Sequence, residues 1–322
     1  MKAIRFAQTG GPEVLQLVDV DLPPPGPGQV RVRHTAIGVN FIDTYQRSGL
    51  YKLPLPSGLG SEAAGIVDEI GDGVTMLRKG DRVAYATALG AYAEANNLAA
   101  DRLVKLPDDI PDEVAAAAML KGMTAQYLLK RTYPVQRGQT ILYHAAAGGV
   151  GLIACQWAKH LGAIVIGTVG SEEKVALARE NGCTHVLNTR NDDWVKRVRE
   201  LTGGEGVPVV YDSVGKDTWN GSLDCLAVRG TMVSFGNASG AVPAIEPGVL
   251  SAKGSLYLTR PTLFHYTRTA RELQETADDL FAVMQSGAVK VAVHQRFKLA
   301  DAAKAHEALH SRRTTGATIL MP

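Results

Sequence analysis

Cysteine is scarce in this chain, and no two cysteines lie close together in sequence. The 322 residues include three cysteines, Cys155, Cys183 and Cys225, and none of them belongs to a CxxC pair. A zinc site of the four-cysteine kind is therefore excluded. An odd, sparse set of thiols is typical of a reducing compartment, so we expect a cytoplasmic protein.

The chain also lacks an excess of one charge and any long apolar run. It has 34 Lys and Arg against 32 Asp and Glu, for a net charge of +2. This balance disfavours nucleic acid or an anionic membrane surface as a main partner. No apolar run approaches the roughly 20 residues that cross a bilayer. The first residues, MKAIRFAQTGG, lack the apolar stretch of a signal peptide.

The length and the change of pattern along the chain indicate two domains. A chain of 322 residues exceeds what one hydrophobic core usually serves. The first 122 residues read as strands separated by turns. For example, residues 29–39 begin with period-two alternation, and residues 63–86 read as two strands. Residues 21–29 contain too much Pro and Gly for a regular element, and residues 110–130 predict a helix.

After Pro134 strands and helices alternate. The pattern predicts strands at 140–146, 163–169, 184–189, 207–214, 231–236 and 254–258, and helices at 149–162, 171–182, 192–204 and 216–230. Such alternation indicates an α/β fold in which a doubly wound parallel sheet of six strands carries helices on both faces. From residue 268 the mixed pattern returns, with a helix at 268–287 and strands at 295–299 and 317–321. We therefore expect the parallel-sheet domain to be inserted between two pieces of the other domain.

A glycine-rich turn joins the first strand and helix of this series. Residues 146–151, AAGGVG, match the G-x-G-x-x-G motif with alanine in place of the first glycine. Gly148 would let the backbone approach a pyrophosphate, and Gly151 would let the helix pack on the strand. The N-terminus of the helix would offer free N–H groups to the phosphates. We expect a dinucleotide site here, because the turn follows a strand and opens a helix; a purely structural turn is the alternative.

An acidic residue is missing where a site for NAD would need one. Such sites carry Asp or Glu at the end of the second strand, where it binds the ribose 2′-hydroxyl. Here that strand ends in IGTVG, and Ser171 and Lys174 follow. A hydroxyl and a cation in the first turn of a helix suit a 2′-phosphate. The sequence therefore favours NADPH, although Lys174 as an ordinary solvated helix residue, next to Glu172 and Glu173, is the alternative.

Several motifs resemble those of the medium-chain dehydrogenase/reductase superfamily. They are GVNFIDTYQRSGLY, LPSGLGSEAAG, KGDRV, LKGMTAQYLL, HAAAGGVGLIACQWAK, VVYDSVGKDTW and MVSFGNASG, and they span the whole chain. More narrowly, the chain resembles the zinc-free, zeta-crystallin-like quinone oxidoreductases. The resemblance implies a GroES-like, mostly β substrate domain, formed by residues 1–122 and 263–322, and a Rossmann dinucleotide-binding domain at 123–262. It also implies a homodimer, and the β-prone segment KGSLYLTRP is the edge that we expect to pair.

The resemblance also implies which residues bind NADPH. The motif at the nicotinamide end supplies Asn40, Phe41 and Tyr45, and the segment after the linker helix supplies Thr124 and Tyr127. Near the sixth strand the resemblance implies Phe235 and Gly236, and near the C-terminus it implies Arg312. It also implies that the pyrophosphate is bound by Gly148, Gly149 and Val150. The 2′-phosphate is bound, on the same resemblance, by Gly170, Ser171 and Lys174. The closest members have a tyrosine beside this phosphate, at the position of Thr189. The threonine side chain is shorter, so its contact with the phosphate is reduced, and Arg190 is a candidate to replace that contact.

The chain departs from the zinc alcohol dehydrogenases at two metal-ligand positions. Asn40 replaces a cysteine, and Ser61 replaces the histidine of a Gly-His-Glu motif, so we expect no metal. Without a metal, a quinone is a suitable hydride acceptor because its reduction produces an aromatic ring. Tyr45 is a candidate proton donor, but a stacking role is equally compatible with its position. His144 is expected to be structural, and Asp212 and Ser213 do not form a triad because no G-x-S-x-G turn accompanies them.

Two other functions remain open. One is an NADPH-dependent alkenal or enone reductase of the same superfamily, which would add the hydride to a carbon–carbon double bond. The other is an NADPH-binding protein with a structural or RNA-associated role, which the near-neutral charge disfavours. The sequence therefore predicts, first, an NADPH:quinone oxidoreductase with a small-molecule quinone as substrate.

Overall fold

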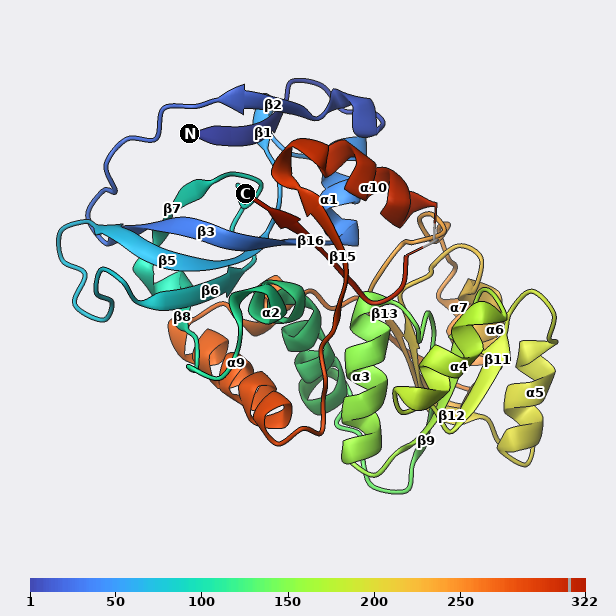
Figure 1. Cartoon of the computed structure of the whole chain (residues 1–322). Coiled ribbons are helices and arrows are strands. Elements are labelled where there is room, and N and C mark those ends of the chain that lie inside the picture. Colours follow the sequence, from blue (N-terminus) through green and yellow to red (C-terminus); the bar gives the residue numbers. More distant parts are fainter. Residues whose placement is uncertain (312–313) are drawn as a thin grey trace. The chain divides into compact units, whose positions relative to one another are not determined.

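The structure, a computed structural model, describes residues 1–311 and 314–322, and the chain divides into two compact units. Unit 1 comprises Met1–Met123, Thr267–Gln285 and Val291–Pro322, and unit 2 comprises Thr124–Tyr266 and Ser286–Lys290. Both chain ends belong to unit 1, as the blue and red segments of Figure 1 show. Unit 2 is thus formed mainly by the middle of the chain.

Unit 1 is built on two β-sheets. The smaller sheet has the order β2-β1-β4, with β1 at Lys2–Phe6, β2 at Gln16–Asp19 and β4 at Ser57–Gly58. The larger sheet runs β15-β16-β3-β5-β6-β8, and β7 also pairs with β3. Its strands are β3 (Gln29–Val39), β5 (Glu62–Ile70), β6 (Arg82–Ala86), β7 (Ala95–Ala99), β8 (Val104–Lys105), β15 (Val293–Lys298) and β16 (Ala317–Met321). The long β3 therefore pairs with three other strands and organises the unit.

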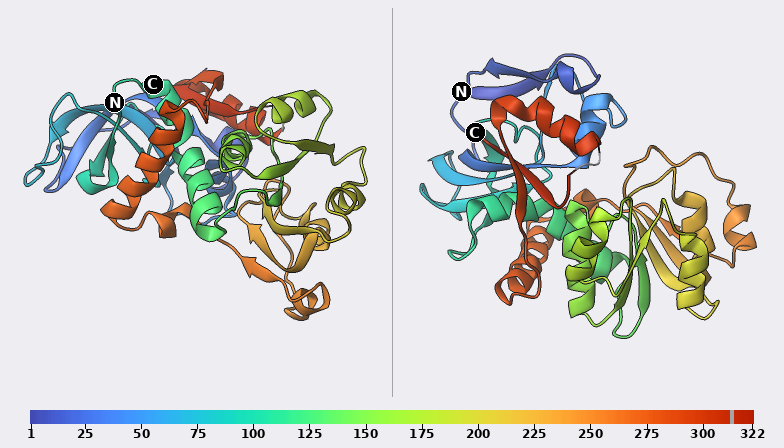
Figure 2. Two further views of the ribbon diagram at one scale, coloured as in Figure 1. Left: turned by 90° about the horizontal axis from the view of Figure 1, so that it is seen from below. Right: turned by 45° about the vertical axis from the view of Figure 1, so that its right-hand side comes forward.

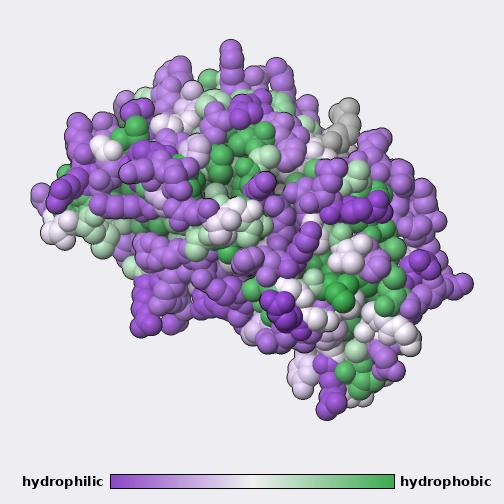
Figure 3. All heavy atoms as spheres, turned by 60° about the horizontal axis from the view of Figure 1, so that its bottom comes forward, coloured by the Kyte–Doolittle hydropathy of each residue, from purple (hydrophilic) through white to green (hydrophobic). Residues whose placement is uncertain are grey.

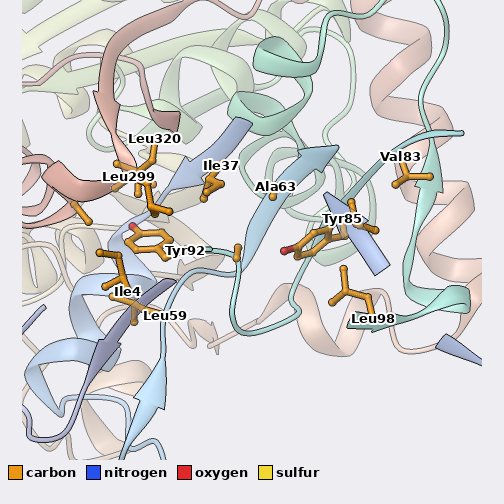
Figure 4. Packing of buried hydrophobic residues seen from close by; sticks show 14 of the residues in the cluster. Ile4, Ile37, Leu59, Ala63, Val83, Tyr85, Tyr92, Leu98, Leu299 and Leu320 are labelled. Carbon is orange, nitrogen blue, oxygen red and sulfur yellow. The ribbon is translucent and has the colours of Figure 1, made fainter. Parts of the chain in front are cut away.

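The apolar core of unit 1 joins both ends of the chain. Figure 4 shows Ile4, Leu59 and Tyr92 close to Leu299 and Leu320, and all five are at most 4% exposed. Burial of these side chains explains why the first and last segments fold as one body, since each buried apolar side chain contributes about 1.5–3 kcal/mol.

Four longer helices belong wholly or largely to unit 1. They are α1 (Phe41–Ser48), α2 (Asp112–Tyr127), α9 (Ala270–Gln285) and α10 (Ala302–His310). The division between the units falls inside α2, after Met123. Gly122 packs closely on α9, because a Cβ there would lie 2.4 Å from Leu280 Cδ1. Short 3-10 turns complete the unit at Pro12–Val14, Ala100–Arg102 and Leu299–Asp301.

Unit 2 contains the predicted six-stranded parallel sheet. Its order is β11-β10-β9-β12-β13-β14, and every neighbouring pair is parallel. The strands are β9 (Thr140–Tyr143), β10 (Ile164–Val169), β11 (His185–Asn188), β12 (Val207–Asp212), β13 (Leu226–Ser234) and β14 (Tyr257–Thr259). The order reverses between β9 and β12, as in the dinucleotide-binding Rossmann fold. The α/β fold class is confirmed.

Helices cover both faces of this sheet, as the two views of Figure 2 show. The helices of unit 2 after residue 140 are α3 (Gly149–His160), α4 (Glu173–Glu180), α5 (Trp194–Leu201), α6 (Trp219–Asp224), α7 (Gly248–Ala252) and α8 (Leu263–Tyr266), and a π turn at Leu128–Thr132 precedes β9. Leu142, Ile166 and Val210 on three neighbouring strands are fully buried. Their burial explains the continuous apolar runs of these strands.

Two predicted elements have different limits in the structure. The helix expected at 216–230 ends at Asp224, because Leu226 already pairs with Val207 as the start of β13. The strand expected at 254–258 begins only at Tyr257. Gly254 and Ser255 form a turn before it with φ of 112° and 57°, which strand backbone does not allow. Strand pairing thus decided the first boundary, and the left-handed backbone of the turn decided the second.

Among the described residues, no helix is long and apolar enough to cross a membrane. On the face shown in Figure 3, hydrophilic residues cover most of the surface, and hydrophobic residues gather in smaller patches between them.

Candidate functional site

One edge of the unit 2 sheet collects most of the predicted cofactor residues. The strands β9, β10, β11 and β13 end at Tyr143, Val169, Asn188 and Ser234. Because the strands are parallel, their carboxyl ends share one edge, where α/β folds bind ligands. The segments that follow these ends contain the predicted residues Gly148, Gly149, Val150, Gly170, Ser171, Lys174, Thr189, Phe235 and Gly236.

The glycine turn after β9 has the geometry of an anion site. Gly148 is the N-cap of α3, and the first helical hydrogen bond runs from Leu152 N to Gly148 O at 2.9 Å. The N–H groups of Gly149, Val150 and Gly151 precede that bond, and no described residue accepts from them. Free N–H groups at the positive end of a helix suit phosphate. A pyrophosphate therefore fits this turn.

Two backbone features of the turn support this reading. A Cβ on Gly151 would lie 2.3 Å from Ala145 O and 2.7 Å from Ala146 O, so only glycine fits where α3 meets the strand. Ala145 has a φ of 53°, which is uncommon for a residue other than glycine. Strained backbone of this kind clusters at ligand sites. No pattern in the sequence predicted the positive φ of Ala145.

The segment after β10 presents a hydroxyl and a lysine. Gly170 has nothing within 4 Å of its Cβ position, and Lys174 N donates to Ser171 O at 3.2 Å in the turn that leads into α4. Asn188 Nδ2 donates to Glu172 Oε2 at 3.3 Å, so this acid faces β11. Thr189 Oγ donates to Val169 O at 3.3 Å. The edge thus combines Ser171 and Lys174, without an acid at the end of β10.

The loop after β13 is fixed by a residue that the sequence did not reveal. Arg260 Nη1 donates to Gly236 O at 3.1 Å and to Ser234 Oγ at 3.2 Å. A Cβ on Gly236 would lie 2.5 Å from Ser213 O, so the loop packs directly on the segment after β12. The Phe235 ring lies 6.0 Å from that of Tyr143. No spacing rule links Arg260 to Gly236, because the strand pairing alone brings them together.

A buried polar network lies below the same edge. Asp212 Oδ2 accepts from Thr218 Oγ and Ser222 Oγ, both at 2.7 Å, and its Oδ1 accepts from two backbone N–H groups. Ser222 gives its proton to Asp212, so His144 Nε2 donates to Ser222 Oγ at 2.9 Å. Burial lowers the pKa of His144. These hydrogen bonds connect the segments after β9 and β12 to α6. They do not form a hydrolytic triad, because Asp212 accepts from Ser222 and not from the imidazole.

Unit 1 holds three further predicted residues at the start of α1. Asn40 is 5% exposed, and its Nδ2 donates to Glu62 Oε2 at 2.8 Å. The ring of Tyr45 lies 6.2 Å from that of Phe41 and 5.3 Å from that of Tyr51, where the contact is edge-on. These three rings form an aromatic cluster, Phe41, Tyr45 and Tyr51, on and just after α1. Such a cluster can stack on a flat conjugated ring.

A chain of hydrogen bonds fixes α1 in unit 1. Arg47 Nη1 donates to His306 Nδ1 at 3.1 Å, so His306 is neutral and its Nε2 donates to Tyr92 Oη at 3.0 Å. Tyr92 Oη in turn donates to Asp43 Oδ2 at 3.0 Å. Burial lowers the pKa of His306 to about 3 and raises that of Asp43 to about 7. The chain joins α1 to α10 and so holds the helix that carries Phe41 and Tyr45.

Two predicted residues lie at the end of α2, in unit 2. Thr124 is 7% exposed and Tyr127 is 2% exposed. The Tyr127 ring stacks on Tyr266 with 4.5 Å between centroids. Arg312 lies outside the described residues.

Family models match both parts of the chain. The alcohol dehydrogenase GroES-like domain matches residues 26–129, and the zinc-binding dehydrogenase model matches residues 149–283. A quinone oxidoreductase of Pseudomonas aeruginosa is 58% identical over 100% of this chain and 99% of its own. This chain belongs to the zeta-crystallin-like quinone oxidoreductase family of the medium-chain dehydrogenases/reductases.

Solved structures agree with this membership. The Escherichia coli quinone oxidoreductase complexed with NADPH is 54% identical, covers 100% of both chains and has a TM-score of 0.99. A 2-haloacrylate reductase of a Burkholderia species is 47% identical over 97% of this chain and 96% of its own. The family therefore includes relatives named for two different acceptors.

Zinc appears in the name of one family model, but the residues here do not fit it. Among the described residues, no group of three or more His, Cys, Asp and Glu is arranged to hold a metal ion. The Asn40 amide nitrogen faces a carboxylate and cannot be a ligand.

Proposed function

We propose that this chain is an NADPH:quinone oxidoreductase that transfers a hydride to quinones without a metal. The observation that carries the proposal is the carboxyl edge of the unit 2 sheet, where free N–H groups at the start of α3 accompany Ser171 and Lys174. The quinone assignment is supported by the 58% identical relative from Pseudomonas aeruginosa. Bound NADPH would supply two electrons and one proton as a hydride.

The residues of the chain have separate roles in this proposal. Gly148, Gly149 and Val150 bind the pyrophosphate, and Gly170, Ser171 and Lys174 bind the 2′-phosphate, with Thr189 beside them. Asn40, Phe41, Tyr45, Thr124, Tyr127, Phe235, Gly236 and Arg312 are proposed for the nicotinamide side. The aromatic cluster stacks on the quinone ring and excludes water. Reduction of a quinone gives a weakly basic phenolate, so water can supply the last proton and Tyr45 need not be an acid.

The proposed domains are 1–122 with 263–322 for the substrate and 123–262 for the cofactor. We further propose a homodimer. Its interface would form at the β14 edge, where Tyr257 is 62% exposed and Leu258 is 37% exposed, because an unpaired apolar edge strand favours pairing with a second copy. A cytoplasmic location is proposed because all three cysteines are buried free thiols.

A second activity has one specific observation in its favour. The 2-haloacrylate reductase relative, 47% identical, is named for a substrate with a carbon–carbon double bond. An enone reductase would bind the same cofactor and differ in the acceptor.

Steady-state oxidation of NADPH with a panel of quinones, enals, haloacrylates and simple aldehydes tests the proposal. We expect quinones to give the highest kcat/KM and simple aldehydes to give no turnover, because alkoxide charge needs a metal or a strong acid. Faster turnover of enals or haloacrylates than of any quinone would favour the second activity. No oxidation of NADPH by any acceptor would reject both.

A further inference from the structure

A buried ammonium group in unit 1 has more hydrogen-bond donors than the fold uses. Lys121 on α2 is 5% exposed, and its Nζ lies 3.1 Å from Glu62 Oε2. Within residues 1–311 and 314–322, this oxygen is the one acceptor that the structure gives to Nζ. An ammonium group carries three N–H donors. Two donors therefore remain with which this group can bind an oxygen atom of a ligand.

The partner of Lys121 is a carboxylate that is itself fully satisfied. Glu62 is 0% exposed, and its Oε1 accepts from Leu120 N at 2.6 Å. Its Oε2 accepts from Asn40 Nδ2 at 2.8 Å and from Lys121. Three donors around one buried carboxylate fix its orientation. The Glu62 and Lys121 pair, which we call the buried ion pair, is therefore a rigid unit next to Asn40.

The surrounding backbone makes room for the buried ion pair. A Cβ on Gly38 would lie 2.1 Å from Glu62 Oε2 and 2.4 Å from Ala116 O, so a larger residue would displace the carboxylate. On the other side of Lys121, Gly122 packs closely against Leu280. The backbone on both sides of the pair is thus held by packing, which is what a precisely placed donor requires.

We propose that the Lys121 ammonium group, held by Glu62 beside Asn40, donates a hydrogen bond to the oxygen of the quinone that becomes negative on reduction. This inference rests on the proposed function. In the reaction a C–H bond of the dihydronicotinamide breaks, and its hydride passes to the quinone. NADPH is oxidised to NADP⁺, and the quinone is reduced to a hydroquinone monoanion. Water then gives one proton to that anion, and Lys121 stays protonated throughout.

The chemistry of the buried ion pair explains the choice of ligand. Its net charge is zero, so it has little attraction for a strongly charged anion, but it retains N–H donors in a site without bulk water. A donor of this kind stabilises the phenolate oxygen of the product more than the neutral quinone oxygen, and such differential stabilisation accelerates the reaction. Loss of one charge-assisted hydrogen bond should lower the rate about 10- to 100-fold.

The experiment compares the wild type with a double variant, Lys121→Met/Glu62→Gln. Replacing both residues avoids the buried unpaired carboxylate that Lys121→Met alone would leave. Lys121→Arg serves as the conservative variant, since it keeps a cation with several donors. Thermal unfolding shows whether each protein is folded, and the Kd for NADPH, measured by nucleotide fluorescence, shows whether it binds the cofactor. The kinetic measurement is kcat with a series of quinones whose hydroquinones differ in pKa.

We expect the double variant to lose about 10- to 100-fold in kcat with quinones that give the most basic hydroquinone anions, and less with the others. Lys121→Arg should recover part of this selective loss. An equal loss across the series, or no loss, would mean that the buried ion pair only supports the fold. If the wild type reduces no quinone at all, the proposed function fails and not this inference alone.

A binding measurement tests the same donor without turnover. The wild-type protein, without nucleotide, should bind p-nitrophenol preferentially as the phenolate and lower its apparent pKa, followed by absorbance. The double variant should lose that preference. A bound nitrophenol with an unchanged or raised pKa in the wild type would overturn the assignment of Lys121.

Discussion

Lys174 and Tyr45 have different roles in the proposed reaction, one toward the cofactor and the other toward the quinone. Lys174 follows β10 at the edge that carries the glycine turn, and its proposed role is to bind the 2′-phosphate of the cofactor. The ring centroid of Tyr45 lies 6.2 Å from that of Phe41 and 5.3 Å from that of Tyr51, and its proposed role is to stack on the quinone ring. The two residues can therefore be separated by experiment, because one should affect nucleotide choice and the other should hardly affect it.

Lys174→Ala should weaken NADPH binding and leave NADH binding almost unchanged. A charge-assisted hydrogen bond contributes about 1.5–3 kcal/mol, so the Kd for NADPH should rise about 10- to 100-fold. Fluorescence titration of both nucleotides measures the effect. An equal loss for the two nucleotides would show that Lys174 supports the fold and does not bind the 2′-phosphate.

Tyr45→Phe should retain most of the quinone turnover. The substitution keeps the ring and removes only the hydroxyl, and the phenolate product is weakly basic enough to take its proton from water. The measurement is kcat with a quinone at saturating NADPH. If turnover disappears while NADPH still binds, Tyr45 is a proton donor and the enone reductase becomes the better hypothesis.

At the scale of elements, β14 differs from the other strands of its sheet. The strand is three residues long, β13 is its one neighbouring strand within the part of the chain that the structure describes, and Tyr257 is 62% exposed. Val228, near the turn that precedes β14, is 72% exposed. Exposed apolar residues at an unpaired edge favour pairing with a second copy across a two-fold axis.

The purified protein should be a dimer, and Tyr257→Lys should make it a monomer. A lysine at an edge strand opposes pairing, and the exposed position leaves the fold of one chain unaffected. Light scattering at micromolar concentration gives the mass of each species. Met76→Lys, at a position in unit 1 that is 56% exposed, is the matched control and should remain dimeric. A monomeric wild type would contradict the proposed interface.

At the scale of the whole molecule, buried histidines link stability to pH. His34 Nδ1 donates to Ala93 O at 2.7 Å and its Nε2 accepts from Tyr85 Oη at 2.9 Å, so the folded protein needs the neutral ring. Burial lowers the pKa of His34 from 6.5 to about 4. His306 shifts in the same direction, and Asp43, with its pKa raised to about 7, shifts in the opposite direction.

The sign of the effect of His34 follows from proton binding. Between pH 6.5 and about 4 the unfolded chain binds a proton at His34 and the folded chain does not, so stability falls as the pH falls. The contribution over this window is about 3 kcal/mol. Urea unfolding at several pH values should show a smaller acid loss for His34→Gln than for the wild type, since both retain His306 and Asp43. Equal losses in the two proteins would exclude His34 as a source of acid sensitivity.

Chelators should have no effect on the activity of the whole enzyme. Asn40 and Ser61 replace metal-binding residue types, and Asn40 presents its amide nitrogen to Glu62. Dialysis against EDTA followed by a quinone assay, with elemental analysis of the same sample, measures the outcome. Stoichiometric zinc whose removal abolishes turnover would disprove the metal-free mechanism.

The sequence alone determined the features that depend on local pattern. The alternation of apolar runs and helical segments after Pro134 predicted the parallel sheet, because the two periodicities of helix and strand are visible in sequence. The sequence also predicted the glycine turn at 146–151, and the absence of an acid before Ser171 indicated the cofactor. These inferences needed only residues that are neighbours along the chain.

Tertiary structure alone decided the contacts between distant residues. Glu62 and Lys121 are charged residues within apolar segments, but the contact of Glu62 with both Lys121 and Asn40 arises only where β5 packs against α2. The contact of Arg260 with Gly236 depends on the pairing of β13 with β14, and the end of α6 at Asp224 depends on the register of β13 with β12. The physical reason is the same in each case. Such contacts arise when distant elements pack and pair, and the spacing of residues along the sequence does not predict that packing.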